Sequence, residues 1–233
     1  MKVLFVGNSH TYFNDMPRLF AQMCEEMTGV RPEVTMLAYS GRSLRWHREE
    51  HFSLRFALMY GGYDYCVVQQ QAHPFPEESE TRHDFGNISD MCSRAGTRAV
   101  IFMTWAEKAK PQNAARMTGF YRALASDTGA LLAPVGELFE SLRRDHPEIE
   151  LYWMDGEHAS VCGDYLAAAC FAALLCPDGE IAKLSNRAID FGVCFDGPDG
   201  VPVTVDDRPA AESFICAEHA EIIKAEVAKR IIA

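Results

Sequence analysis

Short apolar runs alternate with amphipathic stretches along the first part of the chain. The apolar runs have the composition of buried parallel strands, and they lie at residues 2–7, 33–39, 63–69, 97–105 and 130–135. Apolar residues between them recur at helical spacing, which predicts helices at about residues 15–27, 50–60, 81–95 and 113–127. This alternation predicts an α/β fold, a three-layer α/β/α sandwich with about five parallel strands.

The pattern changes after residue 134. Two further helices are expected, at residues 136–145 and 161–176. Residues 196–209 are rich in Asp, Gly and Pro, which predicts a loop with room for one short hairpin strand. Residues 210–233 have the pattern of an amphipathic closing helix. We therefore expect one flavodoxin-like domain over residues 1–233, with a loop and helix extension from about residue 190.

Composition narrows the classes of function. The chain has 233 residues, 48% hydrophobic and 24% charged, as in an ordinary globular protein. Its net charge of -11 argues against a nucleic-acid partner, because such binding usually needs a concentrated basic face. Its 8 cysteines form no C-x-x-C pair and several lie within apolar runs, so we expect buried free thiols rather than a disulfide framework.

The sequence also bears on location and cofactors. No run of about 20 apolar residues occurs, so no membrane span is expected. The opening MKVLFVGNSH is too short in its apolar part for a signal peptide, which favours a cytoplasmic location. There is no G-x-G-x-x-G and no P-loop, so no nucleotide cofactor is indicated. The sequence leaves the oligomeric state open.

A serine stands directly after the first predicted strand, in Gly7-Asn8-Ser9-His10-Thr11. Ligands of open α/β sheets bind at the carboxyl ends of the strands, so the Ser9 hydroxyl is placed where a substrate would lie. A helix-capping role for this serine is the alternative, and the motif alone favours it.

A second group of polar residues lies far along the chain, where Asp155-Gly156-Glu157-His158 precedes a predicted helix. A catalytic serine needs a neutral imidazole as its base, and the imidazole needs an acceptor on its other nitrogen. A D-x-x-H turn can bring both groups together locally. Taken alone, the pattern is equally that of an Asx turn with a solvated histidine.

Together, the two blocks resemble the first and last blocks of the SGNH, or GDSL, hydrolase family. Ser9, Asp155 and His158 fall on that family's nucleophile, acid and base, and the resemblance covers about residues 1–176. It implies a serine esterase that needs no metal or organic cofactor. The expected substrate is a small-molecule ester, with an O-acetylated carbohydrate as the class that the resemblance suggests.

The family also builds an oxyanion hole from the serine N–H, a glycine N–H and an asparagine side chain. The resemblance implies that Ser9 and Gly41 supply the first two. Where the family often has G-x-N-D, this chain has Gln69-Gln70-Gln71. Gln71 takes the asparagine position by its distance from the strand, with Gln69 as the alternative, and Gln70 is expected to matter little.

Other residues are candidates for weaker reasons. His10 beside the nucleophile, Gln69, and Trp105 at the end of the fourth strand are possible substrate contacts, and Trp105 serves equally well as a packing residue. His47-Arg48-Glu49-Glu50-His51 matches H-x-x-E-H, a metalloprotease pattern. No third ligand stands out and the segment is charged, so we predict no metal site.

Three alternatives to an esterase stay open at the level of sequence. A carbohydrate-binding relative without catalysis is supported by the missing asparagine. An acyltransferase would use the same three residues. A metal-dependent hydrolase based on His47 and His51 is the third, and a chelator would test it.

Overall fold

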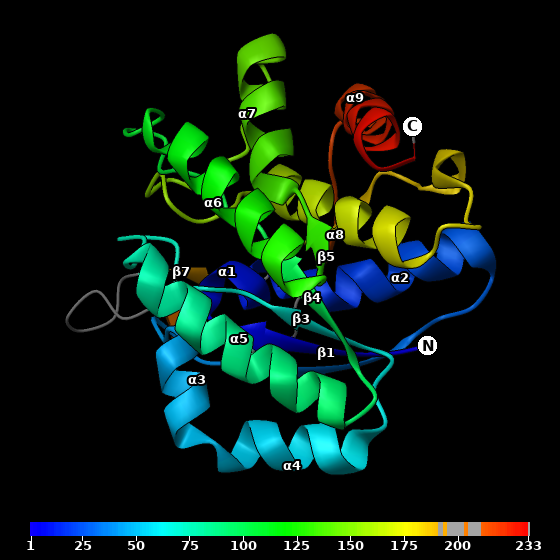
Figure 1. Cartoon of the computed structure of the whole chain (residues 1–233). Coiled ribbons are helices and arrows are strands. Elements are labelled where there is room, and N and C mark those ends of the chain that lie inside the picture. Colours follow the sequence, from blue (N-terminus) through cyan, green and yellow to red (C-terminus); the bar gives the residue numbers. More distant parts are fainter. Residues whose placement is uncertain (191–192, 195–202, 205–210, 233) are drawn as a thin grey trace.

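A computed structural model of the chain describes residues 1–190, 193–194, 203–204 and 211–232 (Figure 1). Its main sheet consists of β1 (Lys2–Gly7), β2 (Glu33–Ala38), β3 (Tyr65–Val68), β4 (Arg98–Phe102) and β5 (Leu131–Ala133). The strand order is β2-β1-β3-β4-β5, and every neighbouring pair is parallel. The predicted five-stranded α/β/α sandwich is confirmed.

Helices follow the strands, mostly where the sequence pattern predicts them, but the first and third were not predicted. They are α1 (Ser9–Tyr12), α2 (Met16–Thr28), α3 (Leu44–Glu50), α4 (Phe52–Gly61), α5 (Glu78–Arg94), α6 (Asn113–Thr128), α7 (Val135–Asp145), α8 (Val161–Leu175) and α9 (Ala217–Val227). Short 3₁₀ turns lie at Phe13–Asp15 and Ile181–Lys183, and a π turn covers Ala228–Ile232. No helix among the described residues is long and apolar enough to cross a membrane.

The sheet separates two hydrophobic cores. Val3 and Phe5 of β1 belong to the core that α2, α7, α8 and α9 form on one face, whereas Leu4 and Val6 belong to the core that α3, α4, α5 and α6 form on the other (Figure 1). Successive strand residues point to opposite faces, so a strand that is apolar throughout serves both cores. This explains why KVLFVG has no polar residue between Val3 and Val6.

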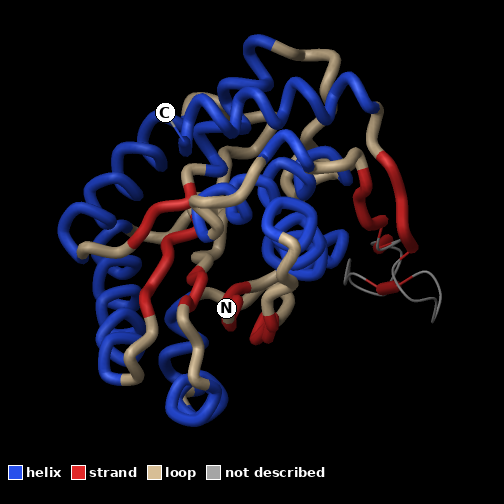
Figure 2. The backbone as a smooth tube through the Cα atoms, turned by 90° about the vertical axis from the view of Figure 1, so that its right-hand side faces the viewer, coloured by secondary structure: helices blue, strands red, loops and turns tan. Residues whose placement is uncertain are grey.

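The last part of the chain differs from its prediction. Residues Ala211–Phe214 form strand β9, which pairs antiparallel with β6 (Arg187–Asp190), so the closing helix begins only at Ala217. A smaller ladder joins β7 (Val193–Cys194) to β8 (Val203–Thr204). Figure 2 shows both ladders apart from the main sheet. The loop predicted at 196–209 lies outside the described residues except for 203–204.

The turns that leave the sheet set the position of the site. The loops after β1, β2, β3 and β4 all start at the carboxyl edge of the parallel sheet. Side chains on these loops therefore converge although their positions in the sequence are far apart. The predicted site residues from Ser9 to Trp105 lie on these four loops.

Candidate active site

Ser9 is the first residue of α1, directly after the turn that leaves β1. Asn8 precedes the helix in extended conformation, and its side-chain oxygen accepts a hydrogen bond from the His10 N–H at 3.0 Å. Asn8, rather than Ser9, is thus the capping residue, which leaves the Ser9 hydroxyl for another partner. Only 6% of the Ser9 surface is exposed.

Gln69 anchors this turn from the end of β3. Its Oε1 accepts hydrogen bonds from the Asn8 N–H at 2.8 Å and from the Thr11 hydroxyl at 2.9 Å. The approach requires Gly7, because a Cβ there would lie 2.4 Å from both Gln69 Oε1 and Thr11 Oγ1. Gln69 is fully buried, so in this arrangement its side chain fixes the backbone on either side of Ser9.

The D-x-x-H turn meets Ser9 from the other end of the chain. His158 Nε2 lies 2.7 Å from Ser9 Oγ, and His158 Nδ1 lies 2.6 Å from Asp155 Oδ2. The second oxygen of Asp155 accepts the backbone N–H groups of Glu157 and His158. Burial alone would raise the pKa of Asp155, but the hydrogen bonds from the His158 ring and the Glu157 N–H bring it below its usual value.

The structure thus brings Ser9, His158 and Asp155 into one line of hydrogen bonds across 149 positions of sequence. Local geometry explains the second half of this line. Gly156 adopts a left-handed conformation with φ of 73°, which lets the chain turn back between Asp155 and His158. A β-bridge between Tyr152 and Ala159 closes the turn at its base.

Two aromatic rings enclose the His158 imidazole. Phe13 stacks on one face, with ring centroids 4.2 Å apart and planes 13° from parallel. His10 covers it at 4.7 Å and 30°. Burial lowers the pKa of His10 well below its usual value, and the neighbouring His158 and His73 lower it further. His10 is therefore neutral at physiological pH, and its ring serves to cover the His158 imidazole.

The His73 ring packs against the His10 ring, with 5.1 Å between their centroids. His73 Nδ1 lies 3.6 Å from Glu107 Oε2, beyond hydrogen-bonding distance. The Glu107 carboxylate accepts hydrogen bonds from Lys110 at Oε1 and from Asn113 at Oε2. Burial lowers the pKa of His73 to about 4, although Glu107 favours the charged ring. Sequence reasoning identified neither Phe13 nor His73, since their role arises from contacts between distant loops. The position of His73 just after the glutamines was the one available signal.

The predicted oxyanion donors lie on two neighbouring loops. Gly41 occupies a turn at φ of 65°, and Arg42, the next residue, is tied to the nucleophile turn because its carbonyl accepts from Asn8 Nδ2 at 3.0 Å. Gln71 is partly buried, and its side-chain nitrogen has a long contact of 3.5 Å with the His73 carbonyl. Gln71 is thus the least constrained of the three glutamines.

Gln70 has a structural role, and the expectation that its loss changes the activity little stays a prediction. It is buried, its Oε1 accepts the N–H groups of Leu44 and Gln71, and its Nε2 donates to Thr81. These bonds connect the loop after β3 to α3 and α5. Because the amide is buried and satisfied at both ends, its loss would cost stability.

The three predicted substrate contacts lie in the interior. His10 and Gln69 occupy the positions given above. Trp105 is 1% exposed, stacks on Phe139 at 4.0 Å, and donates its indole N–H to the Glu157 carbonyl at 2.9 Å. Trp105 therefore supports the backbone next to His158. Direct contact of these side chains with a substrate stays a prediction.

The H-x-x-E-H pattern does not lie on one continuous helix, because α3 ends at Glu50. His47 lies in α3 and is buried, not exposed as its charged neighbours suggest, and its Nε2 lies 2.8 Å from the Gly7 carbonyl oxygen. His51 separates α3 from α4 at φ of 53°. Within the described residues, no group of three or more His, Cys, Asp or Glu is placed to hold a metal ion.

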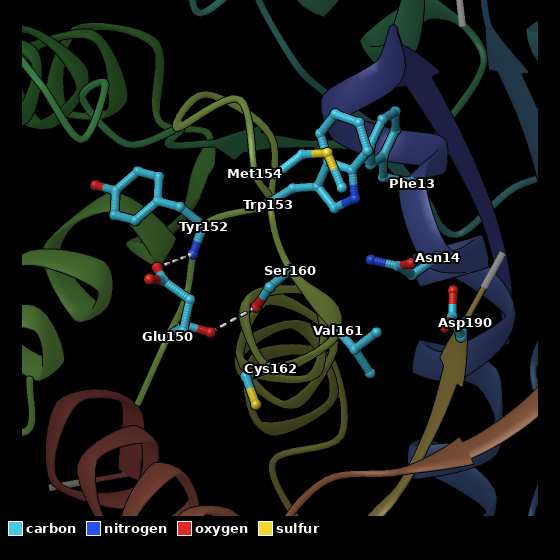
Figure 3. Close-up of a pocket in the computed structure, with 10 residues that line it drawn as sticks. All are labelled: Phe13, Asn14, Glu150, Tyr152, Trp153, Met154, Ser160, Val161, Cys162 and Asp190. Carbon is cyan, nitrogen blue, oxygen red and sulfur yellow. Dashed lines mark hydrogen bonds between the residues drawn. The ribbon is translucent and has the colours of Figure 1, made fainter. Parts of the chain in front are cut away.

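A surface pocket lies next to Phe13, the residue that stacks on His158 (Figure 3). Phe13 and Trp153 line it at 6.0 Å between ring centroids, and Ser160, which caps α8, also lines it. Asn14 at its wall donates to Asp164 at 2.8 Å. Neither Ser9 nor His158 lines this pocket, so it is separate from the reacting groups.

Comparison with known proteins identifies the fold. No protein-family model matches the chain, and the search of curated proteins found no similar sequence. A DUF4886 family protein from Bacteroides uniformis has a similar structure, with a TM-score of 0.71 and 16% identity over 100% of this chain and 95% of that one. TesA gives a TM-score of 0.62 and 13% identity, over 76% of this chain and 99% of its own.

Axe2, an acetylxylan esterase from Geobacillus stearothermophilus, is a third similar structure. Its TM-score is 0.58 at 15% identity, over 73% of this chain and 91% of that one. At these identities the likeness concerns the fold. The α/β/α architecture of this chain is thus shared with a protein described as an esterase.

Proposed function

We propose that this chain is a serine esterase of the SGNH type that forms an acyl-enzyme on Ser9. The observation that carries the proposal is the continuous hydrogen bonding from Ser9 Oγ to His158 Nε2 at 2.7 Å and from His158 Nδ1 to Asp155 at 2.6 Å. A nucleophile, a base and an orienting acid need this connectivity. The shared fold with an acetylxylan esterase gives independent support.

The reaction follows from the positions of the protons. Ser9 Oγ attacks the ester carbonyl while His158 Nε2 accepts the hydroxyl proton. Asp155, ionised because hydrogen bonds lower its pKa, keeps the other proton on Nδ1 and stabilises the imidazolium. His158 then protonates the leaving alcohol. Water, deprotonated by His158 in turn, releases the acid and restores Ser9.

The negative charge of the tetrahedral intermediate needs donors. We assign the N–H groups of Ser9 and Gly41 and the side-chain amide of Gln71 to this role. Support comes from the hydrogen bond between Asn8 and Arg42, which links the Gly41 turn to the nucleophile turn, and from the weak bonding of the Gln71 amide. Hydrogen-bond donors that are already oriented toward the oxyanion before the reaction are among the largest contributions to catalysis.

The substrate we propose is a small ester whose alcohol is a carbohydrate, with acetate as the acyl group. The sequence resemblance and the Axe2 fold support this class. Acyl transfer to a second alcohol would use the same residues, so hydrolysis and transfer differ only in whether water or an alcohol attacks the acyl-enzyme. A cytoplasmic location and the lack of a nucleic-acid partner stay predictions.

The decisive experiment compares Ser9→Ala with the native chain on nitrophenyl acetate and acetylated sugars. We expect kcat to fall by roughly 10⁴ or more and labelling by a fluorophosphonate to disappear, since the nucleophile is gone. Ser185→Ala is the matched control: that hydroxyl binds Glu26, and the variant should keep its activity. Activity that persists in Ser9→Ala would refute the mechanism. A native chain that binds acetylated sugars without hydrolysing them would favour the binding protein.

A further inference from the structure

Two cysteines that are 152 positions apart lie side by side. Cys24 belongs to the last turns of α2, Cys176 follows the end of α8, and their sulfur atoms are 3.2 Å apart. The two helices pack along each other on one face of the sheet (Figure 1). The thiols therefore join two elements that lie apart in sequence and in contact in space.

The two sulfurs differ in their access to solvent. Cys24 is fully buried, whereas Cys176 is half-buried and lines a surface pocket together with Thr28, Pro32 and Pro177. A small reagent can thus reach Cys176 first, and Cys24 lies directly behind it. A disulfide requires about 2.0 Å between sulfurs, so the pair must close by roughly 1 Å.

Their interaction also makes the thiols unequal in acidity. The hydrogen bond between the two sulfurs lowers the pKa of Cys176, although burial opposes this, whereas the same interaction and burial raise the pKa of Cys24. The thiolate is the reactive form of cysteine. The more accessible sulfur is therefore also the more nucleophilic one, and the buried one retains its proton.

We propose that Cys24 and Cys176 form a peroxide-sensitive dithiol that oxidises to a disulfide between α2 and α8. The Cys176 thiolate attacks hydrogen peroxide, so an S–O bond forms, the O–O bond breaks and hydroxide leaves to become water. The Cys24 sulfur then attacks the Cys176 sulfenic acid. The S–S bond forms, the S–O bond breaks, and the hydroxyl group leaves as water with the Cys24 proton. Two thiols lose two electrons and one peroxide gains them.

The crosslink would act on stability rather than on the reaction. α2 follows the turn that carries Ser9, and α8 follows the turn that carries His158, but the two sulfurs lie at the opposite ends of both helices. Closing a long loop restricts the unfolded chain, so we expect the oxidised form to melt roughly 5 to 10 °C higher. The inference does not depend on the esterase assignment.

The chain contains a matched control pair. Cys66 of β3 and Cys92 of α5 interact through their thiols in the other hydrophobic core, where both are fully buried. Their contact resembles that of Cys24 with Cys176, but neither sulfur has access to solvent. Cys66 and Cys92 should therefore stay reduced under conditions that oxidise the first pair.

The test treats the full chain with hydrogen peroxide at pH 7.5, blocks the remaining thiols with an alkylating reagent and identifies crosslinked peptides by mass spectrometry. We expect a Cys24–Cys176 disulfide that dithiothreitol reverses, no Cys66–Cys92 disulfide, and the higher melting temperature. Exposed Cys216 verifies that the reagents act. In Cys24→Ser, dimedone should trap a sulfenic acid on Cys176. A Cys176 that remains reduced, or that oxidises in the native chain without bonding to Cys24, would overturn the proposal.

Discussion

Among single residues, the consecutive glutamines Gln69, Gln70 and Gln71 have the same side chain in three different environments. Gln69 and Gln70 are buried and hydrogen-bonded at both ends of their amides, whereas Gln71 is partly exposed with one long contact. A donor that must serve a transition state has to be free of strong partners in the resting enzyme. The environment therefore favours Gln71 over Gln69 for this role, as the position in the sequence does.

Gln71→Ala should lower kcat by roughly 10² to 10³, as loss of one oxyanion donor does elsewhere. KM should change little, because the donor acts mainly on the transition state. Steady-state kinetics on nitrophenyl acetate measure both values. Gln112→Ala is the control, since Gln112 is exposed and caps nothing with its side chain. A Gln71→Ala variant with unchanged kcat would leave the role to Gln69, or to backbone donors alone if Gln69→Ala is also without effect.

Among elements, the connection between the loops after β1 and β3 decides where the nucleophile lies. One side chain, Gln69, accepts from the backbone N–H just before Ser9 and from Thr11 just after it. Gln70 makes comparable bonds, but toward Leu44 and Thr81 on the other side of the loop. Both residues therefore contribute to stability, but only Gln69 also positions the Ser9 turn.

Gln69→Leu should destabilise the fold by roughly 1 to 3 kcal/mol, because buried donors lose their acceptor. It should also lower kcat, since the Ser9 turn loses its anchor. Gln70→Leu should cost similar stability and leave kcat much closer to the native value. Urea unfolding and kinetics at a temperature where both variants are folded give the comparison. An equal loss of kcat in the two variants would contradict a positioning role for Gln69.

The sequence predicts those elements whose signal is local. The five strands are readable because each is a short, mainly apolar run that ends at a turn, although only β1, β3 and β4 are largely buried and β2 is exposed along much of its length. The D-x-x-H turn is readable because Asp155 and His158 lie within four residues. Strand β9 was predicted as helix, since Ala211–Phe214 becomes a strand through pairing with Arg187–Asp190, far away in sequence. The break at His51 is equally invisible in a charged, helix-forming run. The stacking of Phe13 and His10 on His158 likewise needs three-dimensional contacts.

In the whole molecule, buried histidines make folding depend on pH. Burial lowers the pKa of His10, His47 and His73 below the ordinary value of about 6.5. Below pH 6.5 these histidines bind protons in the unfolded chain but stay neutral in the folded chain. Each of them therefore favours unfolding as the pH falls. The buried carboxyl of Asp164 acts in the opposite sense, because burial raises its pKa and the folded chain retains its proton.

His73 allows this effect to be isolated. The pKa of His73 is about 4 in the folded chain. The contribution of neutral His73 to the free energy of unfolding is therefore fully present above pH 6.5 and is lost progressively as the pH falls to 4. Between pH 7 and pH 5 this amounts to at most about 2 kcal/mol. His73→Gln removes the titration, while Glu107 keeps its bonds to Lys110 and Asn113. The variant should lose less stability than the native chain over the same interval.

The measurement is urea unfolding of both proteins at pH 7 and pH 5. Subtracting one pH dependence from the other cancels the contributions of Asp164 and His47, whose pKa values do not depend on His73. The difference reports His73 together with its effect on His10, whose pKa His73 lowers. His83→Gln is the control for replacing a histidine by glutamine, since that side chain is 64% exposed and lies on α5. Equal pH dependence in the native chain and in His73→Gln would mean that His73 takes up its proton without unfolding. The folded chain would then hold a charged His73 ring behind His10, next to the Glu107 carboxylate.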